Sequence, residues 1–204
     1  MQMPKVPLWA KLVISSLIFV VVANFAGVAG VKTSVYLGLF FLVLTLLPIH
    51  FKKLVRYRRD FGITSGVLIL LHGALAFSSY LDLSYSKLFG LPIIGGYIGS
   101  LVLVVMLVTS VYLVQRKLKN AWRAIHACVW FVLPLALMHA NTAAQAYVGE
   151  TPTLALVTLG GLSVFGIFKF AVSRTNLRES LRDAVLVLAG MGFNMMIWQI
   201  AQLK

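Results

Sequence analysis

The sequence predicts an all-α integral membrane protein, built as a bundle of six or seven transmembrane helices. Of its 204 residues, 60% are hydrophobic and only 11% are charged, whereas soluble domains are roughly 45 to 50% apolar. So few charged side chains cannot cover the surface of a soluble domain. The apolar residues also fall in runs close to the length of about 20 residues that a helix needs to cross a bilayer. No run shows the alternation of strands in a membrane barrel.

Six apolar runs predict spans, and a seventh run is a further candidate. In chain order the runs cover about residues 8–28, 35–50, 61–80, 93–115, 122–140, 153–171 and 184–202. Pro48 ends the second run because proline disfavours a continuing helix. The glycines at the start of the fourth run, Gly95, Gly96 and Gly99, would let two helices approach closely.

The seventh run contains Asn194, Trp198 and Gln199, which also suit a helix lying in the membrane interface. One bundle accounts for the whole length, so we expect a single transmembrane domain over residues 1–204 with no internal repeat.

The basic residues predict the orientation of the bundle. The formal net charge is +13, and the Lys and Arg residues lie in short segments between the runs rather than in a patch for nucleic acid. Two basic residues are near the amino end, five follow the second run, four follow the fourth and four follow the sixth, so fifteen lie on the side of the membrane that holds the amino terminus. The other three, Lys32, Lys87 and Lys204, lie on the opposite side if the seventh run crosses. Because cytoplasmic loops carry the excess of Lys and Arg, we expect a cytoplasmic amino terminus in an inner (plasma) membrane of the bacterial type.

Three histidines lie inside the predicted spans: His72 in the third run, and His126 and His139 in the fifth. Ionisable side chains are costly in a membrane and usually mark a functional site. Haem iron takes axial histidine nitrogen, and a helical bundle can hold the ring between facing helices. Hydrogen bonding across helices and a proton or ion path stay open as alternatives. We find no carboxylate deep in a predicted span, which disfavours the proton path.

The residues alone do not select an axial pair. His126 and His139 are thirteen residues apart, which places them about 220° apart around an ideal helix. They therefore do not share a face, although Pro134 between them could bend the helix. Counted from the cytoplasmic side, His72 lies about 10 Å from the level of either of the other two.

Three segments carry a resemblance to a known family. They are RRDFGITSGVLILLHGALAFSSY, GSLVLVVMLVTS and QRKLKNAWRAIHACVWFVLPLALMHA. Over about residues 45–140 the chain resembles the ferric reductase-like transmembrane domain, and within that family the MsrQ (YedZ) type of haem-binding membrane subunit. The matching positions are Arg58, Arg59, Gly62, His72, Thr109, Ser110, Trp122, His126 and His139. The segment LLPIHFKK departs from the pattern of this type, and the residues after the sixth run lie outside the resemblance.

The resemblance implies a noncovalently held haem b, one or two per chain, bound by His72 and His139, with His126 in a supporting or second-haem role. Relatives of the NADPH oxidase type have two histidines on each of two helices, and a single His72 on the third run counts against a second haem. Some relatives also bind flavin mononucleotide. Arg58, Arg59 and Arg123 would then meet its phosphate or a haem propionate, or they anchor the helix ends at the membrane surface.

We therefore expect an electron-transfer subunit of an oxidoreductase rather than a stand-alone enzyme. Cytoplasmic flavin or membrane quinol would supply the electrons, and a soluble or membrane redox partner at the outer face would receive them. Two alternatives belong to other classes: a structural subunit of a larger membrane complex that kept the fold, and a proton- or ion-conducting helical bundle.

Overall fold

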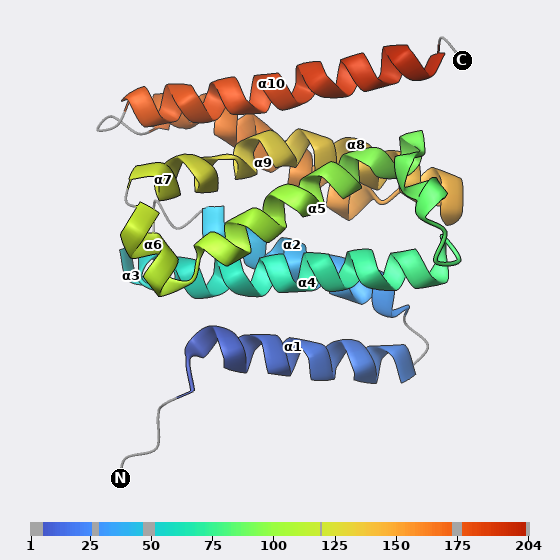
Figure 1. Cartoon of the computed structure of the whole chain (residues 1–204), viewed down its shortest axis with the longest axis horizontal. Helices are drawn as coiled ribbons and strands as arrows, with labels where there is room; N and C mark the ends of the chain where they lie inside the picture. The colour runs from blue at the N-terminus through green and yellow to red at the C-terminus, as the bar shows by residue number, and fades with distance from the viewer. Residues whose placement is uncertain (1–5, 26–28, 47–51, 119, 173–176, 203–204) are drawn as a thin grey trace. The chain divides into compact units, whose positions relative to one another are not determined.

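The computed structural model describes residues 6–25, 29–46, 52–118, 120–172 and 177–202, and the regular structure within these ranges is helical (Figure 1). The predicted all-α class is therefore confirmed. The chain divides into two compact units, one ending at Asp82 and the other beginning at Leu83, and each is described by itself. The expectation of one domain over residues 1–204 stays a prediction.

The first unit is organised around two helices that pack closely. Its helices are α1 (Leu8–Phe25), α2 (Gly30–Leu46), α3 (Lys52–Val55) and α4 (Arg58–Ser79). A buried hydrogen bond joins α4 to α2, since Ser65 Oγ donates to the carbonyl of Gly38 at 2.8 Å. A Cβ atom on Gly38 would lie 2.9 Å from Cγ1 of Ile69. The missing side chain at Gly38 therefore lets α2 and α4 approach closely.

The second unit is organised around α8. Its elements are the 3₁₀ helix η2 (Tyr85–Phe89) and the α-helices α5 (Leu91–Thr109), α6 (Tyr112–Leu118), α7 (Asn120–Ala127), α8 (Val129–Tyr147), α9 (Thr153–Val172) and α10 (Leu177–Gln202). Helix α8 contacts α5, α9 and α10, and its Trp130, Leu133 and Leu135 are almost fully buried. This helix carries His139, so the best-packed helix of the unit positions one of the predicted site residues.

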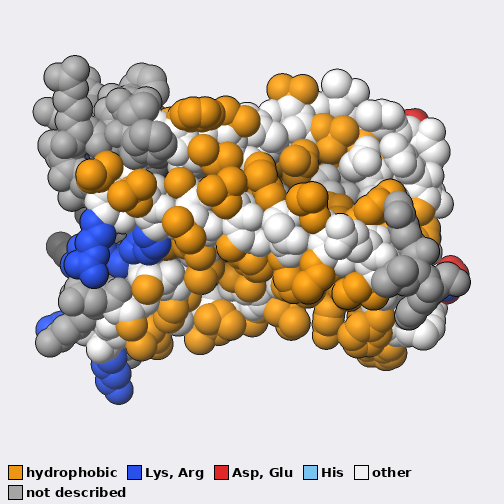
Figure 2. Space-filling model, turned by 90° about the horizontal axis from the view of Figure 1, so that it is seen from above, with side chains coloured by type: hydrophobic (Ala, Val, Ile, Leu, Met, Phe, Trp, Pro, Cys, Tyr) orange, Lys and Arg blue, Asp and Glu red, His pale blue; other side chains and the backbone are white. Residues whose placement is uncertain are grey.

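The helices have the length and composition of membrane spans. Among the residues that the structure describes, five helical segments are long and apolar enough to cross a bilayer: Leu8–Phe25, Arg58–Ser79, Leu91–Thr109, Ala121–Tyr147 and Leu177–Ile200. The apolar stretches Gly30–Leu46 in α2 and Thr153–Phe168 in α9 are shorter. Large apolar side chains are exposed along them, and Figure 2 shows hydrophobic side chains spread over the displayed face. The chain is therefore an integral membrane protein.

The ends of two helices differ from those of the predicted runs. The fourth run was expected to continue to Gln115, but α5 ends at Thr109. Thr109 Oγ1 donates to the Val105 carbonyl at 2.9 Å and Ser110 Oγ to that of Met106 at 2.8 Å.

The expected loop 141–152 is largely helical instead, because α8 continues to Tyr147. The polar residues in this stretch bond within the helix: Thr142 Oγ1 donates to the Met138 carbonyl at 2.9 Å, and Gln145 Nε2 donates to Asn141 at 3.2 Å.

The seventh run forms a longer helix than predicted. Helix α10 begins at Leu177 rather than near Ala184, and its segment of spanning length includes Asp183. The expectation concerned carboxylates deep in a span, and Asp183 lies in the second turn of α10, so that expectation stays a prediction. This side chain is 2% exposed and accepts a hydrogen bond from Arg182 Nη2 at 3.0 Å, so its charge is paired with a neighbouring cation.

Replacing Gly38 with alanine is expected to destabilise the first unit by about 1–3 kcal/mol, because an added methyl group overpacks the α2–α4 contact. The matched control is Gly73→Ala in α4, where an added Cβ meets nothing within 4 Å and alanine favours helix by about 1 kcal/mol. Thermal unfolding in detergent should therefore move in opposite directions for the two variants. Equal shifts would show that the Gly38 contact does not limit stability.

Candidate functional site

His139 is held between α8 and the start of α5. Its Nδ1 lies 3.0 Å from the backbone oxygen of Pro92, and Thr142 Oγ1 donates to the same oxygen at 3.2 Å. A carbonyl oxygen only accepts hydrogen bonds, so Nδ1 is the donor. Neutral His139 therefore has its lone pair on Nε2. Histidines that bind metal commonly donate the other ring N–H to a backbone carbonyl in this way.

The ring of His139 lies against the backbone of α5 at a glycine, Gly96. A Cβ atom on Gly96 would be 2.7–2.8 Å from three ring atoms of His139. One on Gly95 would be 2.9 Å from the carbonyl oxygen of Leu135. Contacts this short do not occur between real side chains, so only glycine fits at these two positions. The predicted role of the glycines in close helix approach is confirmed.

His72 is held in the same manner in the first unit. Its Nδ1 lies 3.0 Å from the carbonyl oxygen of Val31 in the first turn of α2. Nδ1 again donates, and neutral His72 has its lone pair on Nε2. The tautomer of His72 therefore matches that of His139, and both suit iron ligation through Nε2.

The two histidine sites repeat one construction. In each site, the carbonyl that accepts the bond from the histidine belongs to the second residue of a long helix. Seven residues later, about two turns along that helix, a glycine contacts the helix that carries the histidine. The residue that the glycine contacts lies seven positions before the histidine. The four positions are Val31, Gly38, Ser65 and His72 in the first unit and Pro92, Gly99, Val132 and His139 in the second. The expectation of no internal repeat was based on residue identities and missed this shared geometry.

His126 is bound differently. It belongs to α7, which ends at Ala127 with one residue between it and the start of α8, and both helices lie in the spanning segment Ala121–Tyr147. Its Nδ1 contacts the Trp122 carbonyl at 3.0 Å and its Nε2 contacts Ser110 Oγ at 3.0 Å. The Trp122 ring also lies over it, with the centroids 4.2 Å apart. Iron ligation through Nε2 would require the Ser110 contact to open, so this geometry favours a supporting, hydrogen-bonded role.

The three arginines lie at helix ends. Arg58 and Arg59 are exposed in the first turn of α4, and the thirteen residues from Arg59 to His72 span about 20 Å along a helix. The side chain of Arg123 is 62% exposed, and its Nη1 lies 3.7 Å from Glu179 Oε1. These positions are typical of residues that anchor a helix at the membrane surface. Contact of the arginines with a flavin phosphate or a haem propionate stays a prediction.

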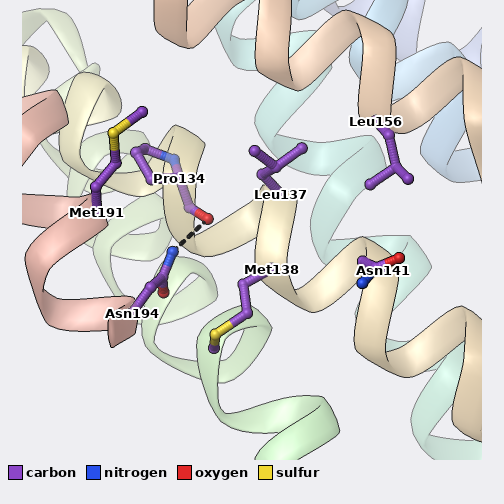
Figure 3. Close-up of a pocket in the computed structure, with 7 residues that line it drawn as sticks. All are labelled: Pro134, Leu137, Met138, Asn141, Leu156, Met191 and Asn194. Atoms are coloured by element: carbon purple, nitrogen blue, oxygen red, sulfur yellow. Dashed lines mark hydrogen bonds between the residues drawn. The ribbon is translucent and has the colours of Figure 1, made fainter. Parts of the chain in front are cut away.

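A cavity of about 500 Å³ lies on another face of α8, beside Pro134 (Figure 3). Its lining residues are Pro134, Leu137, Met138, Asn141, Leu156, Met191 and Asn194. They come from α8, α9 and α10. Met138 lines the cavity and also lies close to α5, since a Cβ atom on Gly95 would be 3.2 Å from Met138 Cε.

Sequence reasoning missed the groups that hold the histidines. Val31 and Pro92 act through backbone oxygens, which every residue has, so their identities carry no signal. Asn194 was read only as a residue that also suits an interfacial helix, and its contact was not foreseen: its Nδ2 donates to the Pro134 carbonyl at 2.6 Å. A usable signal was the spacing of Gly190 and Asn194, which places both on one face of α10.

The fold and the histidines together define a helical membrane protein with ionisable side chains held inside its spans. The family model described as "Ferric reductase like transmembrane component" matches residues 14–137. The chain therefore belongs to the ferric reductase-like transmembrane family, whose members are membrane electron-transfer components that generally bind haem. No solved structure matches the chain.

The donor set fits haem better than a metal ion held by protein ligands alone. Among the residues described, no group of three His, Cys, Asp or Glu side chains could hold a metal ion. Haem iron needs at most two protein ligands because the macrocycle supplies the others. His72 and His139 each have the tautomer for that role.

Proposed function

We propose that this chain is a haem b-binding electron-transfer subunit of a membrane oxidoreductase, with His72 and His139 as the axial ligands. The observation that carries the proposal is that the Nδ1 atoms of His72 and His139 each donate to a backbone carbonyl of a neighbouring helix, whereas that of His126 contacts a carbonyl of its own helix. The chain also belongs to a haem-binding family. Haem held by two imidazoles accepts and donates one electron. The protein's part is to fix both rings, and the backbone carbonyls of Val31 and Pro92 do this.

The proposed orientation of the chain rests on the distribution of its basic residues. We place the amino terminus in the cytoplasm, where flavin mononucleotide or quinol supplies electrons, and a redox partner at the outer face. Within the second unit, the Arg123–Glu179 contact joins α7 to the first turn of α10, and Figure 1 draws α6, α7 and the start of α10 toward the left side of the view. The basic residues of these segments thus lie at one end of the unit, which supports the proposed orientation.

The direct test is the absorption spectrum of the detergent-purified chain, oxidised and then reduced with dithionite. We expect sharp reduced bands of a six-coordinate haem b. A colourless protein from cells that make ample haem would overturn the proposal and favour the structural-subunit alternative.

The His126→Ala variant is expected to keep its low-spin haem and an unchanged haem content, because both ring nitrogens of His126 contact protein groups. Haem per chain, measured by the pyridine haemochrome method, checks this. A fall to half the haem content of the unmodified chain would instead assign His126 to a second haem.

A further inference from the structure

Helix α8 has a break in its hydrogen bonding before it reaches His139. Pro134 lies inside the helix and has no N–H to bond to the carbonyl one turn earlier, so the helix is weakened and tends to bend there. His139 follows by five residues. The position of its ring therefore depends on how the two halves of α8 are held relative to one another.

Helix α10 contacts α8 directly at this break. Asn194 Nδ2 donates to the Pro134 carbonyl at 2.6 Å (Figure 3). A Cβ atom on Gly190 would lie 2.5 Å from the Phe131 carbonyl oxygen and 3.2 Å from Pro134 Cγ. The rings of Phe131 and Phe193 also pack, with centroids 6.1 Å apart. The glycine permits the close approach, and the amide bonds to the proline residue itself.

The amide of Asn194 is committed to this contact. The Pro134 oxygen only accepts, so the NH₂ group must face it. The other amide atom, Oδ1, is buried and has no hydrogen-bond partner among the residues that the structure describes. A buried amide with one unmet acceptor is costly in an apolar helix. Leucine would avoid that cost, so the bond to Pro134 is the interaction that this asparagine provides.

We propose that Asn194 is a positioning residue for His139, and that α10 holds α8 at Pro134 so that the imidazole stays in contact with Gly96. The proposal rests on the proposed haem ligation and adds to it a role for a helix beyond the matched residues 14–137. Two helices then hold the histidine-bearing segment. Helix α5 contacts it through Pro92 and Gly96, and α10 contacts it at Phe131 and Pro134 through Gly190 and Asn194.

The test compares Asn194→Leu with Gln199→Leu, an amide-to-leucine change at an exposed position of the same helix. In the haem-loaded chain, Asn194→Leu is expected to shift the midpoint potential of the haem. The shift should correspond to a change of about threefold or more in the equilibrium constant for haem reduction, because this is the effect typical of one interhelical hydrogen bond in a membrane. The low-spin EPR signal should shift with it. Asn194→Gln, which keeps the amide, should lie closer to the unmodified chain. Gln199→Leu should change neither quantity.

A second measurement does not need haem. In the haem-free chain, hydrogen exchange at the backbone amides of residues 135–140 should be about threefold or more faster in Asn194→Leu and unchanged in Gln199→Leu. An unaltered potential, EPR signal and exchange rate in Asn194→Leu would overturn the positioning role. A chain that binds no haem but shows the faster exchange would overturn the proposed function while leaving the contact between α10 and α8 established.

Discussion

In the His139→Ala variant we expect the spectrum of low-spin haem b to disappear. Alanine removes one of the two proposed axial ligands, and iron with a single imidazole becomes five-coordinate and high-spin. Haem content should fall about tenfold or more, since even the outer-shell partners of metal ligands commonly change affinity by about 10- to 100-fold. Absorption and EPR spectra of the purified variant measure both effects.

His72→Ala should give the same result, because both histidines present the same tautomer to the iron. His126→Ala is the matched control, as it removes an imidazole from the same predicted span as His139. If either His72→Ala or His139→Ala keeps the low-spin spectrum, that residue does not belong to the axial pair. If both keep it, the electron-transfer proposal loses its structural basis.

The Gly96→Ala variant is expected to weaken haem binding by about tenfold without removing any ligand. The new methyl group would lie within 2.8 Å of the His139 ring, so the ring must leave its present position and lose its bond to the Pro92 carbonyl. Overpacking of this kind costs about 1–3 kcal/mol, and about 1.4 kcal/mol is a factor of ten in affinity. Haem titration of the haem-free chain measures the change.

Gly160→Ala in α9 is the control for Gly96→Ala, since an added Cβ there meets nothing within 4 Å. Its haem affinity should equal that of the unmodified chain. Normal haem affinity in Gly96→Ala would show that the His139 ring can occupy a second position that binds equally well.

The sequence was a good guide to the spans and a poor one to their ends. Length and apolar content determine whether a helix can cross a bilayer, and both are visible in composition. The ends are not visible there. Ser110 and Thr142 each bond to the carbonyl four residues earlier, yet α5 ends at Thr109 whereas α8 continues to Tyr147. Hydropathy treats both residues alike as weakly polar.

The residues of the candidate site were likewise predictable only in part. The histidines could be identified because an ionisable side chain in an apolar run is conspicuous. Their tautomers could not, since each depends on a carbonyl 41 or 47 residues away in the chain. The role of Asn194 was not foreseen for a related reason: its contact with Pro134 spans 60 residues, and a buried amide has the same hydropathy as an interfacial one.

The repeated histidine construction has a thermodynamic consequence. Each unit contains one of the two proposed ligands, so under the proposed pairing neither half of the chain binds haem fully without the other. Haem then acts as a linked ligand, and a ligand that binds only the assembled state stabilises it by about 2.7 kcal/mol at a hundred times its dissociation constant. The amount of protease-resistant chain in cells should therefore follow the haem supply, and a cell starved of haem would lose the protein rather than store it empty.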